Sequence, residues 1–276
     1  MTRPYAEVIG DPIAHSKSPL IHNFWLGKLG IDAEYRACHV RADELADYFA
    51  RRRGDAAWRG CNVTVPHKER IAPQIDAVDA RAKAVGAVNT VCRDDGRLIG
   101  TNTDVDGVGE AVGSLDLTGQ EVCVIGAGGA ARAAYQFLSH QRCAAVVVLA
   151  RDPDKALKVA KEFELLAASA LLRPGSAALG VAKLLINATQ LGMTGQERMP
   201  AFVIDELDQL DNDAVIFDMV YVPLDTELLK AAKRRGLRTS DGLSMLIGQA
   251  AAAFEKFFGQ PAPREHDAEL RALLAA

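Results

Sequence analysis

The chain has 276 residues, of which 49% are hydrophobic and 25% are charged, the balance of a globular protein that is long enough for two domains. Its net charge is −4, and the densest basic run, Arg51 to Arg53, is flanked by Asp47 and Asp55, so we expect no nucleic-acid partner. No apolar run approaches ~18 residues and the first residues form no apolar signal, which predicts a cytoplasmic protein without a membrane partner.

Cysteine usage predicts a reducing compartment. The number of cysteines is odd, and none has the C-x-x-C spacing of a metal site or a redox pair. We therefore expect structural thiols and no metal site. The cysteines are Cys38, Cys61, Cys92, Cys123 and Cys143.

A strand over residues 5–9 and a helix are predicted at the start of the chain. Ser18 directly before Pro19 predicts a helix N-cap with proline at the first helical position, and an apolar stripe over residues 20–29 continues that helix. Ser16 and Ser18 have two interpretations: they only cap the helix, or their hydroxyls hold a small carboxylate at its start. The spacing alone favours neither.

Further elements are expected before residue 105. The hydrophobic patterns predict strands over 33–38, 61–65 and 86–91 and helices over 43–53 and 71–84. The sequence Asp94-Asp95-Gly96 predicts a hairpin turn. The polar run TNTD, residues 101–104, follows the hairpin and predicts either a loop or the wall of a site.

Polar side chains gather at the end of the strand predicted over 61–65. Asn62 and Thr64 alternate with valines, and Lys68 follows shortly after the strand. Open α/β sheets bind ligands at the carboxyl ends of their strands, so these three side chains are candidates for a site. A solvated lysine is the alternative for Lys68. His67 is expected to be structural, because no second histidine has metal-ligand spacing.

A glycine turn follows the strand predicted over 122–125. Gly126, Gly128 and Ala131 fit a G-x-G-x-x-G/A pattern, in which the first glycine permits a tight turn and the second lets the backbone approach a pyrophosphate. A helix over 130–138 and a strand over 144–150 follow. A glycine turn without a ligand and a methyltransferase site are alternatives. The order strand, turn, helix, strand favours a dinucleotide site.

Eight motifs in order resemble the shikimate dehydrogenase family, from about residue 5 to residue 259. They are HSKSPLIHN, NVTVPHKE, GAVNT, GTNTD, GAGGAAR, NATQLGM, DMVYVPLDTELL and DGLSMLIGQAAAAFEKFFG.

The resemblance implies an α/β fold with two α/β domains and a cleft between them. Residues 1–105, completed by a C-terminal helix within 242–276, would form the substrate-binding domain. Residues 106–241 would form a Rossmann-like domain that binds NADP. The expected reaction interconverts 3-dehydroshikimate and shikimate, and the expected state is a monomer or a homodimer.

The resemblance also implies roles for single residues. Lys68 and Asp104 match the catalytic pair, which we treat as one coupled acid–base unit. The residues that match substrate contacts are Ser16, Ser18, Thr64, Lys68, Asn89, Asp104, Tyr221 and Gln249. The residues that match cofactor contacts are Gly126, Ala127, Gly128, Gly129, Ala130, Arg151, Asp152, Thr189, Met219, Gly242 and Met245. Core packing is the alternative role of the two methionines.

One departure concerns the cofactor. NADP-dependent members typically read Asn-Arg-Thr where this chain has Ala150, Arg151 and Asp152. Arg151 suits a 2′-phosphate, whereas Asp152 would repel it, bind the ribose of NAD, or cap the next helix. We expect NADP, with NAD possible because of Asp152. The alternatives are an NAD-dependent quinate/shikimate dehydrogenase and, from another class, a non-catalytic sensor of shikimate-pathway metabolites.

Overall fold

The structure is a computed structural model that describes residues 3–175 and 179–275. The chain divides into two compact units, Met1–Thr103 with Gln249–Ala276, and Asp104–Gly248. Each unit contains one six-stranded sheet. No helix among the described residues is long and apolar enough to cross a membrane.

The sheet of the first unit is mixed, with the spatial order β2-β1-β3-β5-β6-β4. β1 runs parallel to β2 and β3, whereas β5 runs antiparallel to β3 and β6. The strands are β1 (Tyr5–Gly10), β2 (Glu34–His39), β3 (Trp58–Val63), β4 (Ala77–Val78), β5 (Thr90–Asp94) and β6 (Arg97–Thr101).

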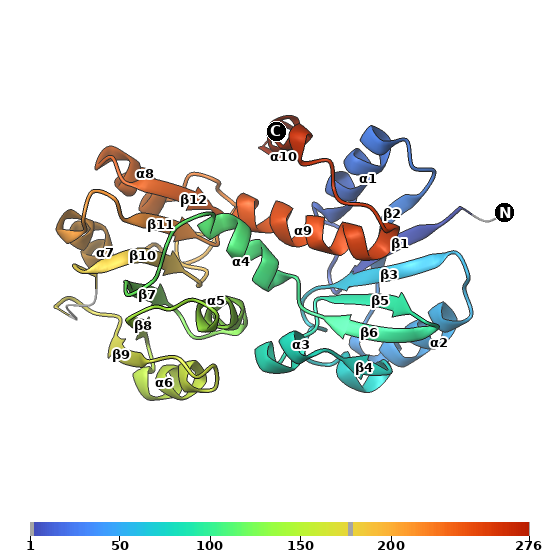
Figure 1. Ribbon diagram of the computed structural model, residues 1–276, viewed down its shortest axis with the longest axis horizontal. Coiled ribbons are helices and arrows are strands. Elements are labelled where there is room, and N and C mark those ends of the chain that lie inside the picture. Colours follow the sequence, from blue (N-terminus) through green and yellow to red (C-terminus); the bar gives the residue numbers. More distant parts are fainter. Residues whose placement is uncertain (1–2, 176–178, 276) are drawn as a thin grey trace. The chain divides into compact units, whose positions relative to one another are not determined.

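Helices pack against this sheet, and every residue of β1 is buried. Figure 1 shows the C-terminal helix α10 (red) beside α1 (blue), where Leu270 and Leu274 are buried. The helices are α1 (Ser18–Leu29), α2 (Leu45–Arg53), α3 (Ala80–Val85), α10 (Asp267–Ala275) and the end of α9 (Gly242–Phe258), which starts in the second unit.

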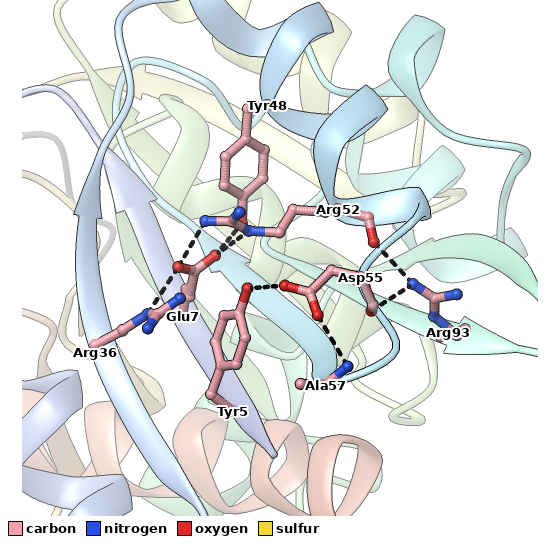
Figure 2. A network of polar contacts seen from close by, with 8 residues as sticks. All are labelled: Tyr5, Glu7, Arg36, Tyr48, Arg52, Asp55, Ala57 and Arg93. Atoms are coloured by element: carbon pink, nitrogen blue, oxygen red, sulfur yellow. Dashed lines mark hydrogen bonds and ion pairs between the residues drawn. The ribbon is translucent and has the colours of Figure 1, made fainter. Parts of the chain in front are cut away.

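A buried carboxylate anchors α2 to the sheet (Figure 2). The side chain of Glu7 in β1 accepts hydrogen bonds from Arg52 at 2.8 and 3.0 Å, from Arg36 at 3.1 Å and from the hydroxyl of Tyr48 at 2.8 Å. These donors compensate for the desolvation of a carboxylate that is only 1% exposed. Glu7 lies in the first half of β1, so this network belongs to the scaffold and not to the strand's carboxyl end.

The tyrosine at the start of β1 adds a second anchor. The hydroxyl of Tyr5 donates to Asp55 at 2.6 Å, and burial together with this bond raises the pKa of Tyr5 to about 12. Arg93 of β5 donates to the carbonyl oxygens of Arg52 at 2.8 Å and Asp55 at 3.3 Å. The end of α2 is thereby bonded to two strands, β1 and β5.

The sheet of the second unit is parallel throughout, with the order β12-β11-β10-β7-β8-β9. The strand before the glycine turn, β7, lies at its centre, where the order of the strands reverses. This doubly wound arrangement confirms the predicted α/β fold class. The strands are β7 (Glu121–Ile125), β8 (Ala145–Ala150), β9 (Ala167–Leu171), β10 (Ala182–Asn187), β11 (Val215–Asp218) and β12 (Arg238–Asp241).

Helices connect the strands of the second sheet, as Figure 1 shows for α5 and α6 after β7 and β8. A core of aliphatic side chains from β7, β10, β11, α7 and α8 packs between strands and helices. The helices are α4 (Asp104–Val112), α5 (Gly129–Ser139), α6 (Pro153–Lys161), α7 (Ala201–Glu206) and α8 (Glu227–Arg234).

Several predicted elements are confirmed, and one is wrong. The hairpin turn is confirmed, because Asp95 and Gly96 have positive φ angles of 44° and 77° between β5 and β6. The helix predicted over 71–84 is wrong: only α3 is α-helical there, and Asp79 caps it by accepting the N–H of Ala82 at 2.7 Å. The preceding residues pair as β4 with β6, so strand pairing overrides the helical pattern.

The strand predicted over 61–65 ends early, at Val63, and Val65 is 69% exposed. The strand predicted over 86–91 begins only at Thr90. The five cysteines are free thiols.

Candidate active site

Backbone hydrogen bonds bring three predicted substrate residues together in the first unit. The N–H of Thr64 donates to Ile9 at 2.9 Å, just past the paired ends of β1 and β3. The carbonyl of Asn89 accepts the N–H of Val63 at 2.7 Å, and the carbonyl of Lys68 accepts the N–H of Val88 at 2.8 Å. These bonds hold the backbone of Thr64, Lys68 and Asn89 near the carboxyl end of β3, and the convergence of the side chains of Asn62, Thr64 and Lys68 stays a prediction.

The amide of Asn89 belongs to a buried network. Its Oδ1 accepts the N–H of Thr103 at 2.7 Å and the hydroxyl of Thr90 at 3.0 Å, and its Nδ2 donates to Oγ1 of Thr103 at 3.0 Å. Asn62 joins the network by donating to Oγ1 of Thr90 at 2.9 Å and accepting the hydroxyl of Tyr35 at 2.6 Å. The sequence interpretation missed Tyr35, Thr90 and Thr103, although the polar run around Thr103 marks the region.

His67 has a structural bond, as expected. Its Nε2 lies 2.6 Å from the carbonyl oxygen of Val40, and the side chain is fully buried. It therefore helps to hold the turn between β3 and Lys68.

The start of α1 differs from the prediction. Ser18 is the first residue of the helix and not its N-cap, which is Lys17, with no side-chain capping bond to the described residues. Instead, Oγ of Ser16 accepts the N–H of Ser18 at 3.3 Å. Ser18 is buried, and Ser16 is half-buried. Both hydroxyls lie at the amino end of α1, where an anion is favoured electrostatically.

The predicted substrate residues are divided between the two units. Gln249, buried in α9, belongs to the first unit, whereas Asp104, which begins α4, and Tyr221 belong to the second. The pairing of Lys68 with Asp104 therefore stays a prediction.

The glycine turn of the second unit has the geometry of an anion-binding loop. Gly126 has a φ of +109°, and a Cβ atom there would lie 2.6 Å from Cγ2 of Thr189, so only glycine fits. Its carbonyl accepts the hydroxyl of Tyr135 at 2.6 Å, which fixes the turn against α5.

The N-terminus of α5 is open. Gly128 is the N-cap, and within the described part of the chain a Cβ atom at Gly128 or Gly129 would contact nothing within 4 Å. Ala131 is buried, where it permits close packing of the helix. The first N–H groups of this 11-residue helix lie at a turn where a side chain would meet no neighbour among the described residues, which suits the pyrophosphate of a dinucleotide.

Arg151 and Asp152 follow the carboxyl end of β8, and both are exposed. Oδ1 of Asp152 accepts the N–H of Lys155 at 3.0 Å, so Asp152 is the N-cap of α6. The capping role considered from the sequence is confirmed. The cap uses one carboxylate oxygen and leaves the charge at the surface.

The other predicted cofactor residues surround the ends of β10, β11 and β12. The N–H of Met219 donates to the carbonyl of Asn187 at 3.0 Å, and Thr189 donates its hydroxyl to Oδ1 of Asn187 at 2.6 Å. Gly242 packs so closely on Met219 that a Cβ atom would collide with the Met219 carbonyl. Met245 is half-buried in α9. These residues frame one end of the parallel sheet.

A curated relative matches nearly the whole chain. Shikimate dehydrogenase (NADP(+)) from Sphingopyxis alaskensis is 52% identical over 274 residues, which are 99% of this chain and 97% of the relative. The chain belongs to the shikimate dehydrogenase family. The predicted family is thereby confirmed.

Family models locate the shikimate dehydrogenase regions along the chain. The shikimate dehydrogenase substrate binding domain matches residues 8–91, shikimate / quinate 5-dehydrogenase matches 109–219, and the shikimate 5'-dehydrogenase C-terminal domain matches 242–269. The polar cluster of the first unit, Thr64, Lys68 and Asn89, lies in the first region, and the glycine turn lies in the second.

Solved structures of the family have the same fold. Shikimate 5-dehydrogenase from Thermus thermophilus, in complex with NADP(H) and shikimate, is 36% identical with a TM-score of 0.82, covering 99% of this chain and all of that one. Quinate dehydrogenase from Corynebacterium glutamicum, in complex with NAD, is 29% identical with a TM-score of 0.87, covering 98% and 99%. Solved structures similar to this chain therefore include complexes with NADP(H) and with NAD.

Proposed function

We propose that this protein is an NADP-dependent shikimate dehydrogenase, which reversibly reduces 3-dehydroshikimate to shikimate in the chorismate pathway. The observation that carries this proposal is the 52% identity over nearly the whole chain to a shikimate dehydrogenase (NADP(+)). The polar residues Thr64, Lys68 and Asn89 of the first unit and the glycine turn of the second support the proposal as candidate groups for substrate and cofactor.

Lys68 and Asp104 are assigned to proton transfer. NADPH supplies the hydride when it is bound. Hydride addition to the ring carbonyl carbon leaves negative charge on the oxygen, which must receive one proton to become the hydroxyl. We assign this proton to the Lys68–Asp104 unit, whose two groups are coupled. In the reverse direction the same unit accepts the hydroxyl proton.

The remaining polar residues are assigned to binding. Ser16 and Ser18 would hold the substrate carboxylate at the amino end of α1, while Thr64, Asn89, Tyr221 and Gln249 would bind ring hydroxyls. The open turn from Gly126 to Ala130 fits the pyrophosphate, and Arg151 fits the 2′-phosphate as a planar cation. A cytoplasmic location and a monomeric or homodimeric state stay predictions.

A quinate/shikimate dehydrogenase that uses NAD is the second candidate. Two observations favour it: the carboxylate of Asp152 beside Arg151, and the likeness to a quinate dehydrogenase in complex with NAD. Because Asp152 caps α6, its carboxylate has a role that does not involve the ribose. This favours NADP. A non-catalytic metabolite sensor would bind shikimate without turning it over.

Replacement of Lys68 tests the assigned chemistry. We expect the wild type to reduce NADP⁺ with shikimate, measured by nicotinamide absorbance, and Lys68→Ala to turn over about 10²–10⁴-fold more slowly. The backbone carbonyl that binds Val88 is unchanged in the variant, so its melting temperature should stay close to that of the wild type. Turnover like that of the wild type would refute the role of Lys68, and no turnover by the wild type would favour the sensor.

A further inference from the structure

A buried carboxylate ends strand β11 in the second unit. Asp218 has no exposed surface, and the strand register places it beside Asn187 of β10. Burial raises the pKa of its carboxyl, and three donors oppose this rise. Oδ1 accepts Nδ2 of Asn187 at 2.9 Å and the N–H of Val220 at 3.0 Å, and Oδ2 accepts the hydroxyl of Thr226 at 2.7 Å.

The loop from 219 to 226 is bonded to Asp218 near both of its ends. Val220 lies two residues after Asp218, and Thr226 is the N-cap of α8, where its Oγ1 also accepts the N–H of Leu229 at 3.2 Å. One carboxylate therefore fixes where this loop leaves the sheet and where it enters the next helix. The loop contains Met219 and Tyr221, which the family resemblance places near the nicotinamide and the substrate.

A second loop, residues 188–191, folds around Asn187. Oδ1 of Asn187 accepts the N–H of Thr189 at 3.1 Å and its hydroxyl at 2.6 Å, and Nδ2 also donates to the carbonyl of Leu191 at 3.1 Å. Oγ1 of Thr189 accepts the N–H of Leu191 at 3.1 Å. An ionised carboxylate only accepts, so Asp218 must face Nδ2 of Asn187. This orientation leaves Oδ1 of Asn187 directed at Thr189.

The second loop also touches the glycine turn. A Cβ atom at Gly126 would lie 2.6 Å from Cγ2 of Thr189 and 3.2 Å from the carbonyl oxygen of Ala188. A rotation of the Asn187 amide would break both bonds to Thr189, whose side chain packs on Gly126. The contacts thus form a continuous path from Asp218 to the predicted cofactor site.

We propose that Asp218 is a positioning residue, which holds the loops 188–191 and 219–226 in place for the nicotinamide half of the cofactor. The inference rests on the proposed function, because the reaction decides which half of the cofactor these loops would face. Asp218 acts through Asn187, Val220 and Thr226. The competing interpretation is a network that stabilises the unit and has no influence on the site.

The substitution Asp218→Asn tests this. It keeps the shape of the side chain but replaces one acceptor oxygen by an amide, so at least one of the three donors loses its acceptor or must rotate. In the ligand-free protein, we expect hydrogen exchange at the amides of Thr189, Leu191 and Val220 to become faster, while exchange within β7 and β8 stays unchanged.

The affinities for NADP⁺ and for adenosine 2′,5′-bisphosphate then show which half of the cofactor Asp218→Asn affects. We expect calorimetry to give an affinity for NADP⁺ at least about fivefold weaker than that of the wild type, and kcat about 10- to 100-fold lower. Affinity for adenosine 2′,5′-bisphosphate, which lacks the nicotinamide, should change by less than about twofold, because the open end of α5 and Arg151 are unaltered.

Two sets of controls separate positioning from stability. Thr226→Ser keeps the hydroxyl and should resemble the wild type, whereas Thr226→Val removes it and should repeat the loss of kcat in Asp218→Asn. Val203→Ala opens a cavity in the core at α7 and should lower the melting temperature without affecting loop exchange or kcat.

The proposal is overturned if Asp218→Asn behaves like Val203→Ala, with a lower melting temperature but wild-type loop exchange, NADP⁺ affinity and kcat. Equal losses for NADP⁺ and the bisphosphate would also overturn it. Failure of the wild type to oxidise shikimate with NADP⁺ would instead refute the proposed function, and the exchange data would still report on the loops.

Discussion

At the scale of single residues, the backbone decides where the candidate site residues lie. Lys68 and Asn89 are held through their carbonyl oxygens, which bind Val88 and Val63. The bond from Lys68 to Val88 does not involve the lysine side chain, whereas the side chain of Asn89 also accepts the backbone N–H of Thr103 at 2.7 Å. Of the two, Lys68 is therefore better suited to mutagenesis, since substitution of its side chain keeps this backbone bond.

We expect the carboxylate of Asp152 to influence the choice between NADP and NAD. Asp152→Asn removes the negative charge and keeps a side-chain oxygen that can cap α6. We expect the ratio of kcat/KM for NADP to that for NAD to rise about threefold to tenfold, because a carboxylate near Arg151 repels the 2′-phosphate through solvent. Steady-state kinetics with both cofactors measures this ratio.

Asp152→Ala is the matched control for the cap. It removes the charge and also the acceptor for the N–H of Lys155, so it should shift the ratio equally but lower stability by about 1 kcal/mol. If neither variant changes the ratio, the carboxylate of Asp152 is only a cap, and Arg151 alone sets the preference.

At the scale of elements, the turn between β7 and α5 gives opposite predictions for the stability of two variants, Gly126→Ala and Gly129→Ala, which each add one methyl group. Gly126→Ala must adopt a φ of +109° and place Cβ 2.6 Å from Thr189, so we expect a loss of stability of about 1–3 kcal/mol and weak NADP⁺ binding. Gly129→Ala meets no atom of the described residues within 4 Å and improves helix propensity. It should fold at least as stably as the wild type.

The methyl group added by Gly129→Ala should affect the affinity for NADP⁺ and not the stability of the protein. It would lie on the open first turn of α5, so we expect Gly129→Ala to weaken NADP⁺ binding in calorimetry although its melting temperature is not lowered. If Gly129→Ala binds NADP⁺ as tightly as the wild type, the pyrophosphate does not lie on this turn.

Local patterns predicted some elements well and others not at all. The glycine turn, the hairpin at Asp95 and strand β7 could be predicted, because their residues carry strong local preferences. The helix over 71–84 was wrong, because pairing of β4 with β6 outweighs its helical pattern. The family motifs contain Asn187, Asp218 and Thr226, but their bonds join positions up to 31 residues apart, which no local pattern predicts.

At the scale of the whole molecule, two different sheets divide the tasks of the proposed enzyme. The mixed sheet of the first unit positions Thr64, Lys68 and Asn89, and the parallel sheet of the second positions the glycine turn. The chain passes from one unit to the other between Thr103 and Asp104 and again within α9. The candidate catalytic pair contains one residue from each unit, Lys68 from the first and Asp104 from the second, and its pairing stays a prediction.

A histidine in the core of the first unit should make the protein sensitive to acid. His22 in α1 is fully buried, stacks on Tyr35 at a centroid distance of 4.0 Å, and has no hydrogen-bond partner among the described residues for either ring nitrogen. Burial lowers its pKa to about 3. Below pH 6.5 the unfolded chain therefore binds a proton that the folded protein does not, and stability falls as the pH falls towards 3.

The size of this effect follows from the two pKa values. Between pH 8 and pH 5, His22 should remove about 2 kcal/mol from the free energy of unfolding. His22→Phe keeps an aromatic ring in the stack and cannot be protonated. Urea unfolding at both pH values measures the free energy of unfolding. Its decrease from pH 8 to pH 5 should be smaller in His22→Phe than in the wild type by about 2 kcal/mol. An equal decrease in both proteins would contradict the role of His22.

The central claim, that this chain oxidises shikimate with NADP⁺, is tested most directly by one set of steady-state measurements on the wild type. These give kcat/KM for shikimate and for quinate, each with NADP⁺ and with NAD⁺. We predict the highest value for shikimate with NADP⁺, by at least about tenfold over any other pair. A higher value for quinate with NAD⁺, or no turnover with any pair, would contradict it.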